Sequence, residues 1–465
     1  TAIINVLRYF DIEFDEGAGF DDTDPRNAYG PYFQRQRVEI YHTYAKSLVE
    51  RGLAYPCFCT EEELDKVRAK QEEDKVLTGY YGEYATCRNL SYEEIEANIK
   101  AGKPYVLRLR SQGSPDKEIT FVDAIKGEIK LPENIHDIVL LKKDGIPTYH
   151  FAHAIDDHLM RTTTVVRGGE WLASAPIHYE LFHLLGFKMP AYAHTAHLMK
   201  FDEETGGKRK LSKRKDPELS LDYYRKDGYH PYTMKVYLLT LLNSNFEEWH
   251  EKFPDKDINE FPFSVEKMNQ SGALFDKDKL HNICKNELSK LSEEELYDFL
   301  YDWAKENEPE NVEKWFGDRE KMLQILRLYM GVGAKRRRKD LMYAKQIFEL
   351  ISYFFDGESA EEMDEFKLDE DMVSKILKSY LAKYDHNDDN SVWFNKLKEI
   401  ADEHGFASDM KAYKANPENF KGNVSDIAEA VRIAVTGRAN TPDLWTIVHI
   451  MGEEQMTERI KKHIK

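Results

Sequence analysis

The chain has 465 residues, a length that allows roughly three domains, each large enough to bury a core of its own. Its hydrophobic fraction of 41% and aromatic fraction of 12% exclude a disordered protein. A net charge of −18 opposes contact with nucleic acid except through local basic patches. Four cysteines are too few for a disulfide scaffold, and no window is apolar enough for a membrane helix. We therefore expect a cytoplasmic protein that does not bind membranes.

Helical periodicity marks the front of the chain. It predicts helices over residues 1–10 and 36–51, and Gly52 stands where the second helix should end. The segment between these helices is acidic and rich in turn-forming residues. A third, strongly charged helix is predicted over 61–75.

Strand patterns follow, with short strands predicted at 105–110, 119–123 and 127–131. The segments DIVLLKKDGIPTYHF and TTTVVRGGEW are rich in strand-forming residues, and each precedes a helical pattern. Such alternation predicts a parallel sheet with crossover helices. From about residue 217 the pattern is almost wholly helical. The sequence therefore predicts an α/β front half with a small inserted module, followed by a helical rear half.

Two basic runs interrupt the acidic background, KRKLSKRK at 208–215 and KRRRK at 335–339. Solvated surface is the ordinary explanation of an isolated basic run. The first run, however, follows the strand-rich segment YAHTAHLMKF and the pair Gly206-Gly207, which can act as a hinge. Two lysines on a flexible loop can hold a triphosphate and stabilise the charge that builds on a leaving pyrophosphate.

The pentapeptide KLSKR resembles the KMSKS signature of class I aminoacyl-tRNA synthetases. Three longer stretches are similar, in the same order, to parts of the bacterial-type glutamyl-tRNA synthetases: GPYFQRQRVEIYHTYAKSLVERGLAYPCFCTEEEL, DGIPTYHFAHAIDDHLMRTTTVVRGGEWLASAPIH and IAEAVRIAVTGRANTPDLWTIVHIMG. The resemblance runs through the whole chain. It implies a ligase that forms glutamyl-adenylate from glutamate and ATP with magnesium, with tRNA present, and transfers the glutamate to tRNA(Glu).

The same resemblance implies the domain organisation. We expect a Rossmann-type α/β catalytic domain, incomplete at its N-terminus, with an inserted α+β module, followed by all-helical stem-contact and anticodon-binding domains. A monomer is expected. The ranges are 1–50 with 135–190 for the catalytic domain, 51–134 for the acceptor-binding insertion, 191–300 for the stem-contact domain with the KLSKR loop, and 301–465 for the anticodon-binding domain.

Residues for glutamate follow from the matched motifs. Tyr149, in PTYHFA, is expected to contact glutamate, and Arg167, in VVRGGEW, to pair with the side-chain carboxylate. A guanidinium grips a carboxylate with two parallel hydrogen bonds and rejects the neutral amide of glutamine. A structural ion pair is the alternative explanation for Arg167.

Residues for ATP lie in two motifs. Glu170 and Trp171 are expected at the adenosine, although Gly169 replaces an acidic residue common in the family and leaves one polar contact open. In the KLSKR loop, Ser212 and Lys213 are expected on ATP, and Lys210 and Lys213 are the expected catalytic pair.

Two acidic neighbours and three histidines could suggest a metal or acid–base site. Adjacent carboxylates on a helix point in different directions, so we expect Asp156 and Asp157 to cap the helix or support the fold. His150, His153 and His158 lie in the segment where the family has substrate pocket and helix, which we favour over a metal site.

Cys57, Cys59 and Cys87 are similar to a zinc site found in some family members. A structural zinc needs four ligands. The family often has a histidine two places after the last cysteine, where this chain has Asn89, so Tyr84 or another residue would have to complete the set. Buried cysteines without metal are the interpretation that we favour, and zinc is the alternative.

The second basic run falls where the family reads the anticodon, and it makes Lys335, Arg336, Arg337 and Arg338 the expected tRNA contacts. Arg337 is the expected counterpart of an arginine that distinguishes enzymes rejecting the glutamine tRNA. Three consecutive arginines leave that alignment open by one residue. Whether this protein also charges the glutamine tRNA stays open.

No HIGH-type motif, which grips ATP in class I synthetases, occurs in the sequence, and residues 1–16 resemble the segment that follows it. Residues 21–24, DDTD, are expected to form a surface loop. A chain that begins at Thr1 would then bind tRNA without activating glutamate, so an inactive tRNA-binding fragment is the alternative to the ligase.

Three other functions fit less well. The truncated paralogue that glutamylates a modified tRNA base lacks a helical anticodon domain, and glutaminyl-tRNA synthetase has a β-barrel there, whereas residues 300–465 show helical periodicity. A plain ATPase would need a phosphate-loop motif, and the sequence contains none.

Overall fold

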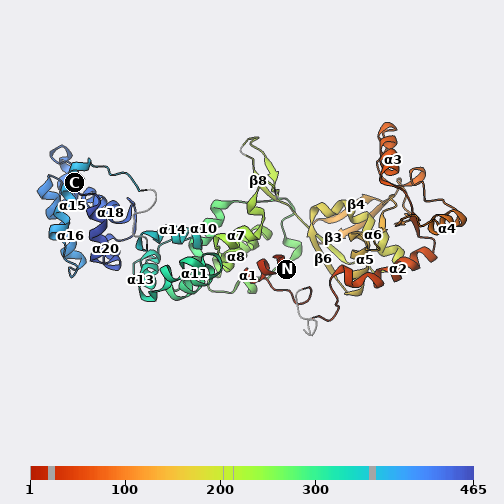
Figure 1. The fold of residues 1–465 in the computed structure, drawn as a ribbon, viewed down its shortest axis with the longest axis horizontal. Coiled ribbons are helices and arrows are strands. Elements are labelled where there is room, and N and C mark those ends of the chain that lie inside the picture. The colour runs from red at the N-terminus through yellow and green to blue at the C-terminus, as the bar shows by residue number, and fades with distance from the viewer. Residues whose placement is uncertain (1, 19–26, 203, 213, 356–362) are drawn as a thin grey trace. The chain divides into compact units, whose positions relative to one another are not determined.

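A computed structural model describes the chain except for residues 1, 19–26, 203, 213 and 356–362. It divides into two compact units (Figure 1), the first made of residues 1–215 and 238–275 and the second of 216–237 and 276–465. Helix α8 (Pro231–Leu242) contributes residues to both units.

The first unit contains helices and strands in alternation. Its helices are α1 (Ala2–Tyr9), α2 (Val38–Glu50), α3 (Glu61–Glu73), α4 (Tyr92–Lys100), α5 (Tyr149–Leu159), α6 (Ala175–Leu185) and α9 (Phe246–Lys252). Its strands are β1 (Ala54–Cys57), β2 (Val106–Leu109), β3 (Glu118–Asp123), β4 (Gly127–Pro132), β5 (Val139–Leu141), β6 (Thr164–Gly168), β7 (Ala191–Thr195), β8 (Leu198–Phe201), β9 (Lys208–Lys210) and β10 (Ala273–Leu274).

The predicted front helices are confirmed, and local signals explain their limits. Helix α2 buries Tyr41, Ala45 and Leu48 on one face, at the spacing of an amphipathic helix. It ends before Gly52, whose φ of 71° suits a residue without Cβ. Helix α3 begins with a reciprocal pair of hydrogen bonds between Thr60 and Glu63, which satisfies backbone donors at the first turn.

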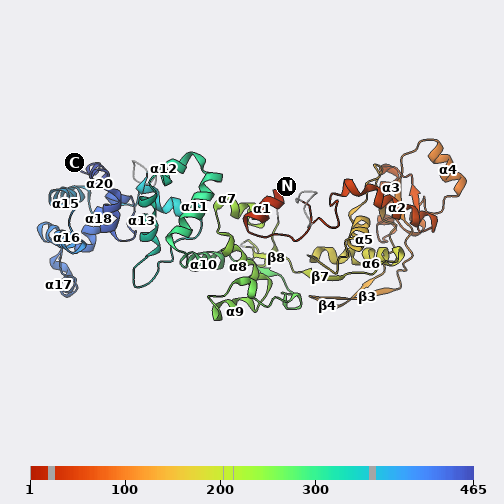
Figure 2. The same ribbon diagram turned by 90° about the horizontal axis from the view of Figure 1, so that it is seen from below.

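A four-stranded sheet in the order β4-β3-β7-β6 is the centre of the first unit. Strands β6 and β7 run parallel, with Arg167 opposite His194, and α6 lies between them in sequence. Figure 2 shows α5 and α6 together on one side of this sheet. On that side Ala175 of α6 joins Phe121 and Tyr192 in one buried cluster. The predicted parallel pairing with a crossover helix is confirmed.

Strands β1, β2 and β5 form a separate antiparallel sheet. Leu109 and Leu140 of this sheet are fully buried with Tyr41 of α2 and Phe151 of α5. Burial of apolar surface contributes about 25 cal/mol per Å², so this shared cluster holds α2 and α5 firmly in place. Helix α5 is therefore fixed on two sides, by α6 and by the small sheet.

Strand pairing does not follow the expected domain ranges. Strands β3 and β4, from the range 51–134, join β7 of the range 191–300 in one sheet. The range 191–300 also contains a β10-β8-β9 sheet, so its first part is not all-helical as expected. The reason is that β7 hydrogen-bonds along β6 and buries Tyr192 and Ala193 there. As a functional division, the four ranges remain a prediction.

The second unit is helical after residue 276, as predicted for the rear half. Its helices are α7 (Leu221–Asp227), α10 (Lys277–Leu288), α11 (Glu293–Asn307), α12 (Val312–Phe316), α13 (Arg319–Met330), α14 (Ala344–Ile351), α15 (Glu370–Lys383), α16 (Asn390–His404), α17 (Met410–Ala415), α18 (Val424–Thr436), α19 (Leu444–Met451) and α20 (Glu453–Lys461). One buried cluster extends from Leu288 to Ile460. Among the helices that the structure describes, none combines the length and the apolar character needed to cross a membrane.

Candidate functional site

Arg167, near the end of β6, is only 9% exposed. Its Nε donates to Nε2 of His194 at 3.0 Å, and its Nη1 lies 3.0 Å from Nδ1 of His178. The guanidinium carbon also lies 4.4 Å from the centre of the Tyr192 ring. Within the described part of the chain, no carboxylate lies at ion-pair distance from Arg167, so the structural ion pair considered as an alternative is absent there.

The histidines around Arg167 are held neutral. Burial, followed by the nearby cationic groups, lowers the pKa of His178 to about 2. Burial also lowers the pKa values of His150 and His194. Arg167 is therefore a buried cation whose direct side-chain partners are neutral, which is the electrostatic setting of a site for an anionic group.

Tyr149 and Trp171 form an aromatic wall beside this cluster. Their ring centres are 4.4 Å apart, and the Tyr149 ring stacks on His153 at 5.7 Å. The backbone oxygen of Trp171 lies 3.5 Å from Nη2 of Arg167. An open cavity of about 710 Å³ is lined by Tyr149 and His153, among other residues. The structure thus brings Tyr149, Arg167 and Trp171 together, as their expected roles require.

The two acidic neighbours on α5 have separate partners. Asp156 accepts hydrogen bonds from Nε of Arg37 at 2.9 Å and from the Tyr41 hydroxyl at 2.7 Å, whereas Asp157 pairs with His153. Both lie within α5 rather than at its N-terminus, so capping does not occur, and Asp156 instead supports the fold. The expectation that the two carboxylates point in different directions is confirmed.

The three histidines of α5 are also separated by their contacts. His150 Nδ1 bonds Nε2 of His178 at 2.9 Å, His153 Nε2 bonds the Tyr192 hydroxyl at 2.8 Å, and His158 stacks on Phe187 with ring centres 3.7 Å apart. The metal-like groupings found among the described residues do not include them. Each of the three histidines thus contacts a different residue, and the choice between pocket and metal site stays a prediction.

The glycines after Arg167 give Glu170 its position. A Cβ at Gly168 would lie 2.3 Å from the Glu170 carboxylate, and one at Gly169 would lie 3.0 Å from the Thr195 carbonyl oxygen. Glu170 is half-exposed and lies 3.4 Å from Nδ1 of His197, just before β8. Glu170 therefore links the Arg167 motif to the segment that leads into the KLSKR loop.

The KLSKR loop begins on β9 of the β8–β9 hairpin. Lys210 lies opposite Met199 and is exposed, while Leu211 is buried and fixes the start of the loop. Gly206, with φ of 68°, forms part of the hairpin turn. Ser212 is partly exposed. Lys213, expected in both catalysis and ATP binding, lies outside the described residues.

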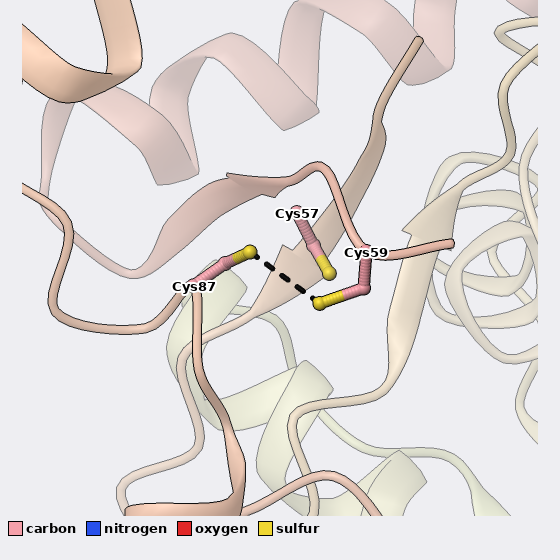
Figure 3. Close-up of side chains that lie close together, drawn as sticks. All are labelled: Cys57, Cys59 and Cys87. Carbon is pink, nitrogen blue, oxygen red and sulfur yellow. Dashed lines mark hydrogen bonds between the residues drawn. The ribbon is translucent and has the colours of Figure 1, made fainter. Parts of the chain in front are cut away.

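Three cysteine sulfurs converge where the end of β1 meets the segment before α4 (Figure 3), and the Sγ atoms of Cys57, Cys59 and Cys87 all lie within 4.8 Å of one another. Cys59 and Cys87 are 3.5 Å apart. A tetrahedral zinc with Zn–S bonds of about 2.3 Å places its sulfurs roughly 3.8 Å apart, so the three thiols fit a zinc ion.

A tyrosine that sequence reasoning did not name lies beside two of these sulfurs. The hydroxyl of Tyr80 lies 3.4 Å from Sγ of Cys57 and 3.3 Å from Sγ of Cys59. Tyr84, one of the candidates for the fourth ligand, instead donates to Asp74 at 3.0 Å, so another residue would have to complete the set. Tyr84 lies on a short 3-10 turn that carries its ring to the surface near α3.

The basic run KRRRK lies in the second unit, in the loop after α13. A cavity of about 650 Å³ is lined there by Arg336 and Arg338 together with Arg327, Thr446 and His449, among others. Lys335, Arg337 and Lys339 of the run do not line this cavity. Arg338 is paired with Asp340 at 2.5 Å. Lys335, Arg336 and Arg337 are exposed.

Asp123, His178, Tyr192 and His194 are the residues at the Arg167 site that sequence reasoning missed. They come from β3, α6 and β7, and no local spacing relates them to Arg167. The only sequence signal was the density of histidines before and after the VVRGGEW motif.

Comparisons with known proteins match both units. Residues 1–282 match the family model of the catalytic domain of class I tRNA synthetases (E and Q), and residues 295–464 match the model of an anticodon-binding domain. A glutamate–tRNA ligase of Acetivibrio thermocellus is 53% identical over 462 residues, which are 99% of this chain and 83% of the relative. One of Clostridium perfringens is 46% identical over 466 residues, 99% of this chain and 84% of the relative.

Solved structures agree with these sequence matches. The crystal structure of a glutamate tRNA ligase from Elizabethkingia meningosepticum in complex with its amino acid superposes with a TM-score of 0.72 at 25% identity. It covers 99% of this chain and 88% of the solved chain. The glutamate-tRNA synthetase of Elizabethkingia anophelis gives the same TM-score at 26% identity, with the same coverage.

Proposed function

The chain belongs to the class I glutamate–tRNA ligases, and from this premise we propose how its residues join glutamate to tRNA(Glu) at the expense of ATP. Glutamate and ATP form glutamyl-adenylate and pyrophosphate. The 3′-terminal adenosine of the tRNA then takes the glutamyl group and releases AMP. The two glutamate–tRNA ligases named above align with 99% of this chain, and this coverage favours the ligase function over an inactive tRNA-binding fragment.

Arg167 binds the side-chain carboxylate of glutamate. The observation that carries this assignment is that the Arg167 guanidinium is nine-tenths buried among neutral imidazoles and the Tyr192 ring. The carboxylate of Asp123 is hydrogen-bonded to His194, so the His194 ring separates it from Arg167. A carboxylate gains charge-assisted hydrogen bonds there, whereas the amide of glutamine would place an N–H₂ donor against N–H donors. Tyr149, which lines the neighbouring cavity, contacts the same substrate.

ATP binds along the motif after Arg167 and the KLSKR loop. Glu170 and Trp171 line the adenosine, and Ser212 and Lys213 hold the phosphates of ATP, which arrives as its magnesium complex. Lys210 and Lys213 stabilise the negative charge that develops on the leaving pyrophosphate. Positioning and electrostatic stabilisation suffice for this step, because the α-carboxylate of glutamate is itself the nucleophile that attacks the α-phosphate of ATP.

The helical second unit reads the anticodon. Its cavity beside α13 is lined by Arg336 and Arg338, which can reach a base or a phosphate, and by the apolar side chains of Leu328, Val332 and Ile450. The helical character of residues 276–465 and the match to an anticodon-binding model disfavour both the truncated paralogue and a β-barrel glutaminyl enzyme. Lys335 and Arg337 are exposed beside the cavity and contact the tRNA backbone.

The cysteine cluster is a zinc site in this proposal. Three thiols within 4.8 Å fit the sulfur spacing of zinc, and the Tyr80 hydroxyl offers an oxygen as the fourth donor. Such a site would hold the segments after β1 and before α4 together. We further propose that the protein acts as a monomer in the cytoplasm.

The proposed ligase reaction is tested by incubating the full chain with ATP, radiolabelled glutamate and tRNA(Glu), and measuring acid-precipitable glutamyl-tRNA. Glutamine in place of glutamate is the control substrate. We expect charging with glutamate and, at equal concentration, at least roughly hundredfold less with glutamine, because the amide would leave donors of the Arg167 site unpaired. Charging with neither amino acid would contradict the proposal.

A further inference from the structure

Arg167 belongs to a directional chain of hydrogen bonds that crosses the first unit. The chain runs from Asp123 at the end of β3, through His194 on β7, to Arg167 on β6, and then through His178 on α6 to His150 on α5. The four successive distances are 2.6, 3.0, 3.0 and 2.9 Å. Asp123, His178 and His194 are each no more than 1% exposed.

The chemistry of arginine fixes every proton in this chain. A guanidinium can only donate, so Nε2 of His194 and Nδ1 of His178 must both be unprotonated acceptors. His194 then carries its proton on Nδ1 and donates it to Asp123, and His178 carries its proton on Nε2 and donates it to His150. Both imidazoles are therefore neutral, each in a single tautomer.

We propose that Asp123 and His194 on one side, and His178 and His150 on the other, are positioning residues that hold the Arg167 guanidinium in the orientation that selects glutamate. This inference rests on the proposed function of Arg167. The two imidazoles take up Nε and one hydrogen of Nη1, and the Trp171 carbonyl oxygen lies 3.5 Å from Nη2. The second hydrogen of Nη1 and the second hydrogen of Nη2 are left for the substrate carboxylate. A rotated guanidinium would lose that paired geometry while keeping its charge.

Asp123 is the residue on which the chain depends. Its Oδ1 accepts from the backbone N–H groups of Ile125 at 3.0 Å and Lys126 at 2.9 Å, while its Oδ2 faces Nδ1 of His194. The backbone N–H of His194 lies between the two oxygens, 3.3 Å from Oδ1 and 3.1 Å from Oδ2. In Asp123→Asn the N–H groups of Ile125 and Lys126 hold the amide oxygen in the Oδ1 position, where the His194 N–H at 3.3 Å can also donate to it. The amide N–H₂ then faces His194 and forces its proton onto Nε2, so two donors meet between His194 and Arg167.

The test is tRNA-dependent ATP–pyrophosphate exchange by Asp123→Asn, with glutamate and with glutamine. We expect KM for glutamate to rise roughly 10- to 100-fold, by analogy with the loss of a partner that orients a metal ligand, with a smaller change in kcat. The preference for glutamate over glutamine should fall by a similar factor. A folded Asp123→Asn variant with unchanged KM and unchanged preference overturns the proposal.

A matched control removes a buried carboxylate elsewhere in the same unit. Asp137 is fully buried and accepts from the Tyr55 hydroxyl at 2.6 Å and from the Ser111 N–H at 2.9 Å, without bonding any member of the chain. Asp137→Asn should lower stability without changing the preference between the two amino acids. An equal loss of preference in both variants would overturn the assignment to the hydrogen-bond chain.

Two further measurements separate this inference from the proposed function. If Arg167→Lys leaves KM for glutamate unchanged, the role of Arg167 fails and the inference fails with it; if Arg167→Lys raises KM and Asp123→Asn does not, only the inference fails. Should Asp123→Asn not fold, ¹⁵N NMR of histidine-labelled protein decides. The proposal requires His194 as the Nδ1–H tautomer and His178 as the Nε2–H tautomer, and any other assignment overturns it.

Discussion

The Nη1 atom of Arg167 lies 3.0 Å from Nδ1 of His178, so this arginine donates to a neutral imidazole where a carboxylate is the common partner. Burial first, and then the positive charge of neighbouring groups, lowers the pKa of His178 to about 2. In the unfolded chain the same side chain titrates near its ordinary pKa of 6.5. The difference makes His178 a source of pH-dependent stability.

Stability should fall on acidification because of His178. Above about pH 6.5 the imidazole is neutral in both states and contributes nothing, whereas between pH 6.5 and about 2 only the unfolded state takes up its proton. The free energy of unfolding should therefore fall by about 1.4 kcal/mol per pH unit for this one group. In His178→Gln the free energy of unfolding should change less steeply with pH between pH 6 and 4, by that same amount per pH unit. Urea unfolding monitored through hydrogen exchange of the α6 amides measures this slope. Equal slopes would contradict it.

Asp156→Ala should destabilise the first unit strongly. Asp156 is the partner of Arg37, which is 3% exposed and would be left as a buried unpaired cation. We expect a loss of about 3–5 kcal/mol. Asp65, which pairs with Arg68 where both side chains are more than 60% exposed, supplies the control. Asp65→Ala should change stability by no more than about 0.5 kcal/mol in the same urea titration, and similar losses in both variants would disprove a structural role for Asp156.

Lys210→Ala should slow glutamate activation. If Lys210 stabilises charge on the leaving pyrophosphate, kcat of ATP–pyrophosphate exchange should fall roughly 10²- to 10³-fold, with little change in KM for glutamate. Lys208 lies on the same strand and is also exposed, so Lys208→Ala removes an equal charge two residues away. We expect less than about a threefold effect from that control. If both variants lost a similar factor in kcat, Lys210 would contribute only general positive charge and no specific stabilisation of the leaving pyrophosphate.

The cysteine cluster should bind one zinc ion per chain. Inductively coupled plasma mass spectrometry of protein purified without chelators should find about one equivalent, and Cys87→Ser should lose it because three-coordinate sites bind weakly. Cys284→Ser, which removes a buried thiol of the second unit, should keep the metal. Tyr80→Phe should weaken zinc retention during dialysis against a chelator. Absence of zinc after reconstitution would restore the interpretation of buried, metal-free cysteines.

Anticodon preference should depend on the arginines that line the cavity of the second unit. Arg336→Ala should reduce the discrimination between tRNA(Glu) and an anticodon variant roughly 10- to 100-fold. Arg337→Ala should instead lower the binding affinity for both tRNAs by the same factor. Filter binding at two salt concentrations measures both effects. The opposite result would return the specificity role to Arg337, as the sequence motif suggests.

Local patterns in the sequence determined much of this protein. The spacing of Tyr41, Ala45 and Leu48 defines α2, and Gly52 ends it, because one helical face and one left-handed residue are properties of neighbours in the chain. The strand patterns and the motifs around Arg167 and Lys210 are local in the same sense. They were sufficient to identify the family and to single out Tyr149, Arg167 and Trp171, which the structure places in contact through Trp171.

Tertiary structure alone decided what surrounds those residues. His194 lies 27 residues after Arg167 and Asp123 lies 71 residues before His194, yet strand pairing and the packing of α6 join them into one hydrogen-bond chain. Likewise Tyr80 rather than Tyr84 meets the cysteines, because a short turn rotates the nearer tyrosine outward. Periodicity indicates which face of an element a side chain occupies, but which distant side chain it contacts depends on how separate elements pack. That packing determines the tautomers of His178 and His194 and the charge of the Arg167 site.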